Sequence, residues 1–227
     1  IFGSDSIWRT VGTSGAIIFE PYDDDTSYEQ PLIRLEGSAH AVRISNLRFV
    51  RQKGYISGTT DSGNPIYATC GIAIDMAYDT STKDKDSAII NSCATGFNVG
   101  LDFSGRGMQF QGNTFSANGY SIRISWPSSM GEDEFTNGSR GIMIQNNRFH
   151  VDLYSDIYVK SGHAYGLSVI GNYRDRRTSG GRTFIHADSQ AINWCISGNS
   201  LNGLYASGSA NLSTIELAGG ALNCVIT

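Results

Sequence analysis

A short strand-like phrase recurs along this chain and limits what it can fold into more than any other feature. The phrase reads apolar, any residue, apolar, polar, a small residue or Asn, and then often Asn and an aromatic. Copies are found at residues 42–49 (VRISNLRF), 88–92 (AIINS), 108–115 (MQFQGNTF), 142–149 (IMIQNNRF), 167–172 (LSVIGN), 194–199 (WCISGN) and 222–227 (LNCVIT). An internal repeat of this kind predicts a stacked array of similar units.

The copies are unevenly spaced. The second apolar residue of each copy falls at positions 44, 90, 110, 144, 169, 196 and 226, so the spacings are 46, 20, 34, 25, 27 and 30 residues. A repeat of helices would hold its period more tightly. A coil of short strands tolerates uneven spacing, because insertions can loop out at its corners.

A second phrase lies between copies of the first and alternates apolar with variable residues. Its copies cover 33–37, 72–75, 101–105, 122–125, 157–160, 185–188 and 215–218. Period-two alternation predicts strands with one buried and one exposed face, and no apolar stripe at helical spacing extends over ten residues. We therefore expect each unit to contain two or three short strands joined by tight bends.

Strands with one apolar face bury it by stacking unit on unit in parallel. The sequence predicts an all-β fold, a right-handed parallel β-helix of roughly seven or more rungs with loop insertions at its corners, forming one domain over 1–227. Asn at the end of the first phrase suits a bend, because Asn tolerates left-handed backbone geometry and bonds the backbone. Stacked Asn side chains are also expected to form a ladder.

Composition excludes several classes of function. The net charge of −4 argues against non-specific nucleic-acid binding, and no apolar run approaches the ~18 residues of a membrane span. The four cysteines lack disulfide or zinc spacing and are read as buried free thiols. Residues 23–25 are three consecutive Asp without the spacing of an EF-hand. No nucleotide-binding motif is present. Because the zinc and EF-hand spacings are also missing, we expect no metal and no cofactor.

The chain resembles the pectate-lyase-like right-handed β-helix proteins, and among them bacteriophage tailspikes and capsule depolymerases. The strand-Asn phrase over 42–226, the opening IFGSDSIWRT and the uneven rung length carry this resemblance. It implies a homotrimer in a virion tail that acts on a bacterial surface polysaccharide: capsule, exopolysaccharide or O-antigen. Because the chain starts at Ile1 and stops within a copy of the phrase, we expect a piece of a longer protein.

Alternation in the second phrase predicts two outward columns of side chains. The first column is expected to contain Arg34, Ala73, Asp102, Arg123, Tyr158, His186 and Glu216. The second is expected to contain Glu36, Asp75, Ser104, Ser125, Lys160, Asp188 and Ala218. This mixture of carboxylates, cations and aromatics is typical of sites that bind and cleave polysaccharides.

Asp75 and Asp102 come from consecutive second-phrase strands. Neighbouring strands lie ~4.8 Å apart, and glycosidases use two carboxyl groups about 5–9.5 Å apart. We therefore predict an acid/base pair of Asp75 and Asp102, with Glu36 as a possible third catalytic member. The alternative is that these are exposed carboxylates in ion pairs with Arg34 and Arg123.

A second cluster contains His186, Asp188, Glu216, Lys160 and Tyr158. Histidine titrates near neutrality and can serve as an acid or a base. β-Elimination needs a base and a cation that stabilises the enolate of a uronic acid, and Lys160 and Arg182 are the candidates for this cation. The alternative is a hydrogen-bonded surface histidine. The five members of this cluster, together with Arg34, Arg123 and Trp126, are the expected substrate-binding residues.

Two corner segments add further candidates. Trp126 begins a segment with Glu132, Asp133 and Glu134, and its ring is suited to stacking on a sugar; a solvated acidic corner is the alternative. Residues 173–182 are locally basic and suit either an acidic polysaccharide or salt bridges between chains.

The sequence therefore predicts glycosidic hydrolysis of a bacterial surface polysaccharide. A lyase that acts by β-elimination is the alternative among enzymes. A non-catalytic glycan-binding adhesin and a structural shaft are the alternatives outside them.

Overall fold

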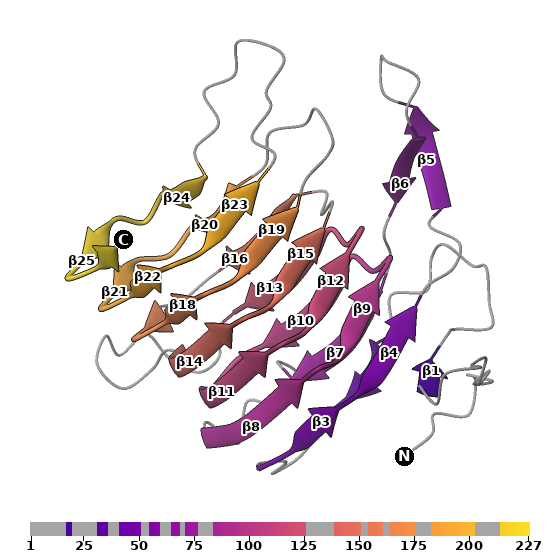
Figure 1. Ribbon diagram of the computed structural model, residues 1–227, viewed down its shortest axis with the longest axis horizontal. Helices are drawn as coiled ribbons and strands as arrows, with labels where there is room; N and C mark the ends of the chain where they lie inside the picture. Colours follow the sequence, from indigo (N-terminus) through magenta and orange to yellow (C-terminus); the bar gives the residue numbers. More distant parts are fainter. Residues whose placement is uncertain are drawn as a thin grey trace.

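A computed structural model of the chain consists of strands and turns, with no helix in the described residues. The described ranges are 17–19, 31–35, 41–50, 55–59, 65–68, 71–76, 84–125, 139–150, 154–160, 164–175, 183–202 and 214–227. Three parallel sheets wind around one core, and each strand pairs with its counterpart one turn along the chain (Figure 1). The predicted right-handed parallel β-helix is confirmed. Within these ranges, no helix is long and apolar enough to cross a membrane.

We label the three parallel sheets A, B and C, and each rung passes through them in the order B, C, A. Sheet A contains β1 (Ile17–Phe19), β4 (Leu47–Val50), β9 (Cys93–Thr95), β12 (Thr114–Ser116), β15 (Arg148–His150), β19 (Tyr173–Asp175) and β23 (Ser200–Asn202). Sheet B contains β2 (Pro31–Arg34), β7 (Ile72–Met76), β10 (Val99–Phe103), β13 (Tyr120–Ile124), β16 (Ser155–Val159), β20 (Thr183–Ala187) and β24 (Ile215–Leu217).

Sheet C contains the apolar first half of each copy of the first phrase, together with short strands that precede it. It contains β3 (Arg43–Ser45), β8 (Asp84–Ile90), β11 (Arg106–Gln111), β14 (Ser139–Gln145), β17 (Ala164–Tyr165), β18 (Ser168–Ile170), β21 (Ala191–Ile192), β22 (Cys195–Ser197), β25 (Ala221–Leu222) and β26 (Val225–Ile226). A separate antiparallel hairpin, β5 (Tyr55–Thr59) with β6 (Pro65–Ala68), stands apart from the stack (Figure 1).

The bend from sheet C to sheet A uses two consecutive residues with separate tasks. The first residue adopts positive φ, as in Asn91 (50°), Gly112 (65°) and Asn146 (52°). Asn and Gly adopt this left-handed conformation at the least cost. A Cβ at Gly112 would lie 2.5 Å from the Asn91 side-chain oxygen, so side chains at this position are limited by the rung below.

The second residue of the bend forms the predicted asparagine ladder. The Nδ2 of Asn113 donates to the Oδ1 of Asn147 (3.0 Å), Asn147 donates in turn to Asn172 (3.0 Å), and Asn172 to Asn199 (2.9 Å). Each Oδ1 also accepts the backbone N–H of the ladder residue one rung below, and each Nδ2 also donates to a strand carbonyl. The buried amides are therefore well bonded, as burial of polar groups requires.

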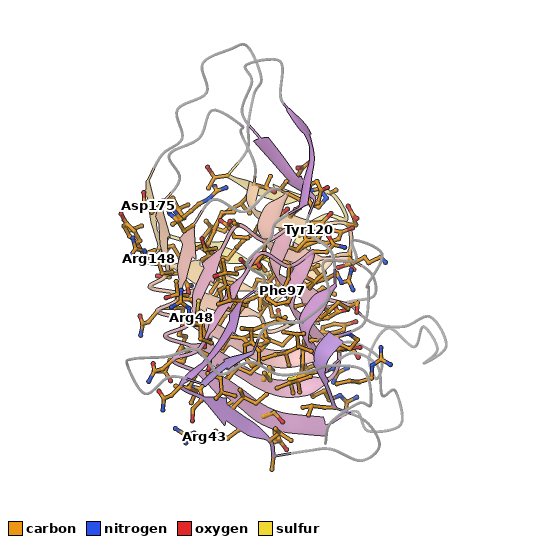
Figure 2. The ribbon with its side chains drawn as sticks, turned by 90° about the vertical axis from the view of Figure 1, so that its right-hand side faces the viewer. Arg43, Arg48, Phe97, Tyr120, Arg148 and Asp175 are labelled. Atoms are coloured by element: carbon orange, nitrogen blue, oxygen red, sulfur yellow. The ribbon has the colours of Figure 1, made fainter. Side chains whose placement is uncertain are left out.

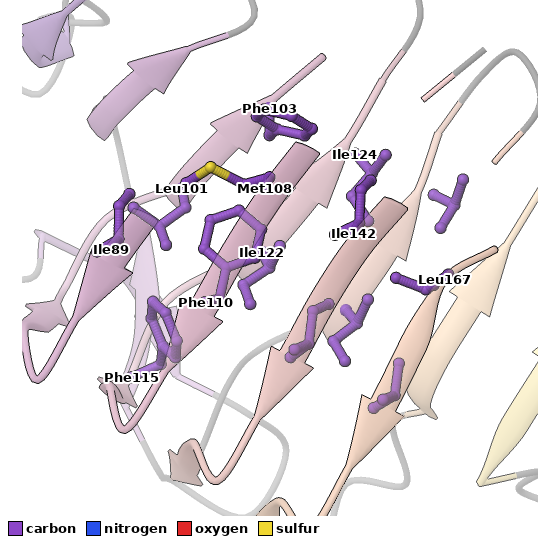
Figure 3. Close-up of a cluster of buried hydrophobic side chains, with 14 of the residues drawn as sticks. Ile89, Leu101, Phe103, Met108, Phe110, Phe115, Ile122, Ile124, Ile142 and Leu167 are labelled. Atoms are coloured by element: carbon purple, nitrogen blue, oxygen red, sulfur yellow. The ribbon is translucent and has the colours of Figure 1, made fainter. Parts of the chain in front are cut away.

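The interior is filled by columns of like side chains from successive rungs. Figure 3 shows one part of this core, where Phe110 of β11 lies among Met108, Leu101 and Ile122. On the sheet A side of the same rung, the ring of Phe115 stacks on its partner in β15, Phe149, with centroids 5.4 Å apart. Burying each such side chain contributes about 1.5–3 kcal/mol, so the column is the main source of stability.

Register corrects one assignment from the sequence. Ile89, rather than Ile90, pairs with Ile44 and Phe110 and is buried. The phrase contains two adjacent isoleucines here, so hydrophobicity alone does not distinguish the inward one. By contrast, the last copy, at 222–227, stacks on the preceding turn: Leu222 pairs with Ile192, and Ile226, the expected inward residue, pairs with Ile196.

One ion pair is buried inside the solenoid. Arg174 occupies the inward position that Phe149 fills one rung below, and its Nε lies 2.7 Å from an Asp156 carboxylate oxygen. Both side chains are almost fully buried. Such a pair is costly to break because removal of either member strands a charge in the core.

The described cysteines agree in part with the prediction of buried free thiols, and Trp194 lies in the core. Trp194 is buried, and its indole N–H donates to the Ala164 carbonyl at 2.7 Å. Cys93, Cys195 and Cys224 are free but only partly buried, and Cys224 packs against the core. Cys70 lies outside the described residues.

Replacing Asn147 with Ala is expected to lower the free energy of unfolding by about 3 kcal/mol, because two Asn113 donors and the Phe110 carbonyl lose their partner in the core. Urea denaturation measures the change. The control is Asn146→Gly at the neighbouring bend position, where Gly accepts the positive φ and a loss below about 1 kcal/mol is expected. Equal losses in both variants would contradict a specific role for the ladder.

Candidate functional site

Connection lengths indicate which face of the solenoid carries function. Links from sheet C to sheet A contain one or two residues in every rung, because the bend geometry is fixed. Links from A to B range from 3 to 21 residues, and links from B to C from 2 to 14. Insertions therefore occur next to sheet B. Variable loops around a rigid scaffold are where binding and catalytic sites usually lie, which directs attention to the outer face of sheet B.

Register defines the outer column of sheet B. It runs through Arg34, Asp75, Asp102, Arg123, Tyr158, His186 and Glu216. Six of these seven residues were predicted in this order. The seventh prediction, Ala73, is wrong, because Ala73 is fully buried and Asp75 takes its place. The sequence placed Ile72 beside Leu101, but in the structure Ile74 pairs with Leu101, so the predicted register of β7 was wrong by two residues.

The second predicted column is present in part. Lys160 and Asp188 follow directly after β16 and β20 and lie on neighbouring rungs, with the Asp188 N–H donating to the Val159 carbonyl. Ser104 is buried, contrary to its outward placement, and Asp75 belongs to the first column.

Several candidates fall outside the described residues. They are Glu36, Trp126, Glu132, Asp133, Glu134, Arg182 and the three Asp at 23–25. Among the residues that the structure describes, no group of three or more His, Cys, Asp or Glu is arranged to hold a metal ion.

Asp75 and Asp102 are adjacent in register, and each is bound by an arginine. The Nε of Arg34 lies 3.3 Å from Asp75 Oδ2. Arg123 makes a two-point contact with Asp102: its Nε donates to Oδ1 at 3.0 Å and its Nη2 donates to Oδ2. Burial lowers the pKa of Arg123, but the hydrogen bonds and attraction to Asp102, together with attraction to Asp75, outweigh burial and raise it.

This arrangement resembles the alternative that the sequence left open, with one difference. The carboxylates are paired with Arg34 and Arg123 as that alternative expected, but they are buried, with only 8% of each side chain exposed. The acid/base role of Asp75 and Asp102 stays a prediction.

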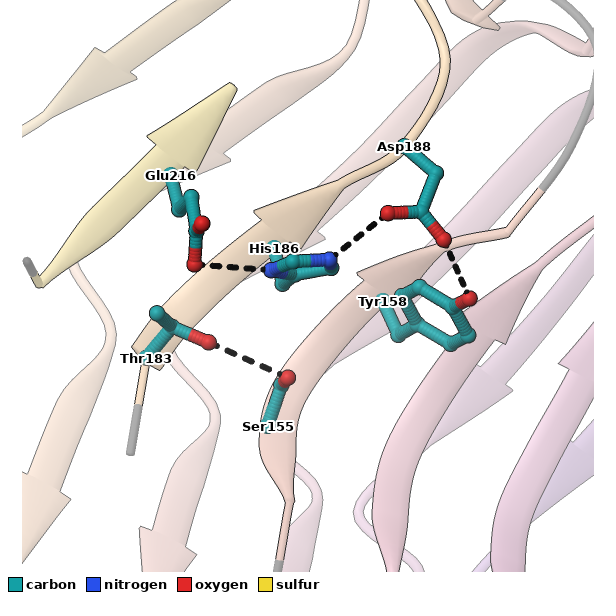
Figure 4. A network of polar contacts seen from close by, with 6 residues as sticks. All are labelled: Ser155, Tyr158, Thr183, His186, Asp188 and Glu216. Atoms are coloured by element: carbon teal, nitrogen blue, oxygen red, sulfur yellow. Dashed lines mark hydrogen bonds and ion pairs between the residues drawn. The ribbon is translucent and has the colours of Figure 1, made fainter. Parts of the chain in front are cut away.

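Four of the five members of the second predicted cluster, all except Lys160, are joined by a chain of hydrogen bonds across three rungs (Figure 4). His186 Nε2 lies 2.8 Å from Asp188 Oδ1, and His186 Nδ1 lies 3.0 Å from Glu216 Oε2. The Tyr158 hydroxyl donates to Asp188 Oδ2 at 2.6 Å. His186 therefore lies between two carboxylates, and one of them is held on its other side by a phenol.

These contacts shift the pKa values of His186, Tyr158 and Asp188. Burial alone would lower the pKa of His186, but its hydrogen bonds to Asp188 and Glu216 outweigh burial and raise the pKa. Burial and the hydrogen bond to Asp188 raise the pKa of Tyr158. The bond from Tyr158 lowers the pKa of Asp188 against the effect of burial, and the bond from His186 lowers it further. The cluster thus favours a protonated His186, a neutral Tyr158 and an ionised Asp188.

An aromatic cluster extends this site. The ring of Tyr158 stacks on Tyr120 with centroids 4.6 Å apart, Tyr120 contacts Tyr154 at 5.2 Å, and Tyr158 contacts the His186 ring at 5.5 Å. Tyr120 and Tyr154 were not among the predicted site residues. The available signal was their position, because Tyr120 begins one second-phrase strand and Tyr154 immediately precedes the next.

Comparison with known proteins adds no relative. Scans against protein-family models, curated proteins and solved structures each gave no match to this chain.

The His186 pKa is expected to lie above its ordinary value of about 6.5. Because the folded pKa is raised, the stabilisation it brings is complete below about pH 6.5 and is lost as the pH rises through the folded pKa. Titration of the imidazole resonances by NMR measures this shift. Glu216→Gln is expected to lower the His186 pKa. A wild-type His186 pKa at its ordinary value would contradict the placement of the imidazole between Asp188 and Glu216.

Proposed function

We propose that the outer face of sheet B binds a bacterial surface polysaccharide and cleaves it by hydrolysis. One observation carries the proposal: a column of ionisable and aromatic side chains runs along the outer face of sheet B. The connections that enter and leave this sheet vary in length. Stacked parallel strands hold those side chains at a fixed spacing of about 4.8 Å, which pre-orients groups along an extended chain of sugars.

The geometry favours Asp188 and Glu216 as the hydrolytic pair. Their side chains are 48% and 47% exposed, so a substrate can reach them, in contrast to the covered Asp75 and Asp102. His186 bonds to both carboxylates, which come from neighbouring rungs, and inverting glycosidases place their two carboxyl groups roughly 6.5–9.5 Å apart. Such enzymes use one carboxylic acid to protonate the leaving oxygen and one carboxylate to activate water.

The lowered pKa of Asp188 keeps it ionised, which suits the base that activates water. Glu216, the other exposed carboxyl group bonded to His186, is then assigned as the acid that protonates the glycosidic oxygen. In this scheme His186 is a positioning residue, because it orients both carboxylates through its two ring nitrogens.

The same protonation states argue against His186 as the base of a β-elimination. A lyase needs a base that removes a proton from a uronic acid. The raised pKa values of His186 and Tyr158 favour the protonated forms of both groups, so neither is well suited to accept that proton.

A non-catalytic adhesin is the second candidate. The observation in its favour is that arginines hold Asp75 and Asp102 and an imidazole holds Asp188 and Glu216, an arrangement that also suits binding of sugar hydroxyls. A place in a homotrimeric tailspike at a virion tail belongs to the same proposal and rests on the resemblance of the repeats.

The test is depolymerisation of bacterial capsules and lipopolysaccharides, followed by mass spectrometry of the products. Asp188→Asn and Glu216→Gln are each expected to reduce turnover by about 10²–10⁴-fold, the usual contribution of a general acid or base. Asp175→Asn is the matched control, because this carboxylate lies on sheet A and pairs with Arg148.

Products distinguish the candidates. Oligosaccharides with an added water support hydrolysis, unsaturated ends would indicate a lyase, and binding without products would indicate an adhesin. Full turnover in both Asp188→Asn and Glu216→Gln would refute their role; loss of turnover in Asp75→Asn and Asp102→Asn would then favour the buried pair.

A further inference from the structure

We infer that the polysaccharide bound at sheet B consists of neutral sugars and not of uronic or other acidic sugars. This inference rests on the proposed function and names the class of substrate for that same site. Three observations carry it: the charge balance of the face, the burial of its arginine pairs and the position of its tyrosines.

Among the residues that the structure describes, the charges on this face cancel. Its described cations are Arg34, Arg123, Lys160 and protonated His186, and its described carboxylates are Asp75, Asp102, Asp188 and Glu216. Arg34, Arg123 and His186 each contact at least one carboxylate, and Lys160 follows the strand beside Asp188. An acidic polymer is attracted by a net positive surface, which this balance does not provide.

Redirecting the arginines toward an acidic sugar is also unfavourable. Arg123 contacts both oxygens of Asp102, and only 8% of the Asp102 side chain is exposed. Turning the guanidinium toward a sugar carboxylate would leave the buried Asp102 carboxylate without its charge partner, which is strongly unfavourable. The arginines therefore serve to hold the aspartates.

The tyrosines provide the recognition that a neutral sugar needs. Tyr120, Tyr154 and Tyr158 form a contiguous cluster beside His186, and Tyr154 is 48% exposed. An aromatic ring with a polar tip packs against the apolar face of a pyranose, while the carboxylates at Asp188 and Glu216 accept hydrogen bonds from its hydroxyls.

Sheet A offers a contrasting surface on another side of the solenoid. Arg48 and Arg148 project from this sheet, away from Tyr120 (Figure 2). The Arg148 side chain is 57% exposed and its guanidinium lies 5.8 Å from the Tyr173 ring centroid, with Asp175 as its carboxylate partner. An acidic glycan would be expected here rather than on sheet B, so Arg148 supplies a discriminating variant.

The test measures binding of the whole chain to an array of bacterial surface polysaccharides, sorted into neutral and acidic members. We expect the bound members to be neutral, with affinity changing less than about twofold when salt rises from about 50 to 500 mM. Tyr154→Ala is expected to weaken binding about tenfold, the effect of losing an aromatic contact of about 1.4 kcal/mol. Arg148→Gln is expected to leave affinity unchanged.

Other outcomes overturn the inference in distinguishable ways. Binding confined to uronic-acid polymers, falling steeply with salt and lost in Arg148→Gln, would refute neutral recognition but leave a glycan-binding function in place. Binding to neither class would refute the proposed function itself. Because Tyr154 is half exposed, the melting temperature of Tyr154→Ala should match that of the wild type, which separates lost binding from lost folding.

Discussion

The asparagine ladder is the interaction on which the rest of the structure depends. Asn113, Asn147, Asn172 and Asn199 lie at the same bend of successive rungs, and each is bonded to the next through side chain and backbone. This bonding allows one geometry for the passage from sheet C to sheet A. With that passage fixed, the rungs stack in register, and the apolar columns align behind them.

A fixed bend on one side determines where variation is allowed. Insertions enter and leave sheet B, while the outward side chains of sheet B keep the spacing that the stack imposes. Residues distant in sequence, such as Tyr158 and Glu216, therefore lie on rungs adjacent to His186 and share one site. The scaffold supplies rigidity, and the chemistry rests on a few side chains placed upon it.

Much of this was predictable because strand alternation has a strict period of two residues. The first phrase predicted the bends and the ladder. Alternation in the second phrase predicted the order of Arg123, Tyr158, His186 and Glu216. Prediction failed where two apolar residues adjoin or a strand begins early, as at Ile90 and Ala73, since hydrophobicity does not fix register there. The ring contacts of Tyr120 were also missed, because stacking across rungs depends on side-chain conformation at a strand end, which no sequence period encodes.

The central claim is that a sugar chain lies on the outer face of sheet B. A crystal structure of the protein with an oligosaccharide of its substrate bound tests this most directly. The account predicts sugar rings packed on Tyr154 or Tyr158, with hydroxyls bonded to Asp188 and Glu216. An oligosaccharide bound on sheet A beside Arg148, with the outer face of sheet B free of sugar, would contradict it.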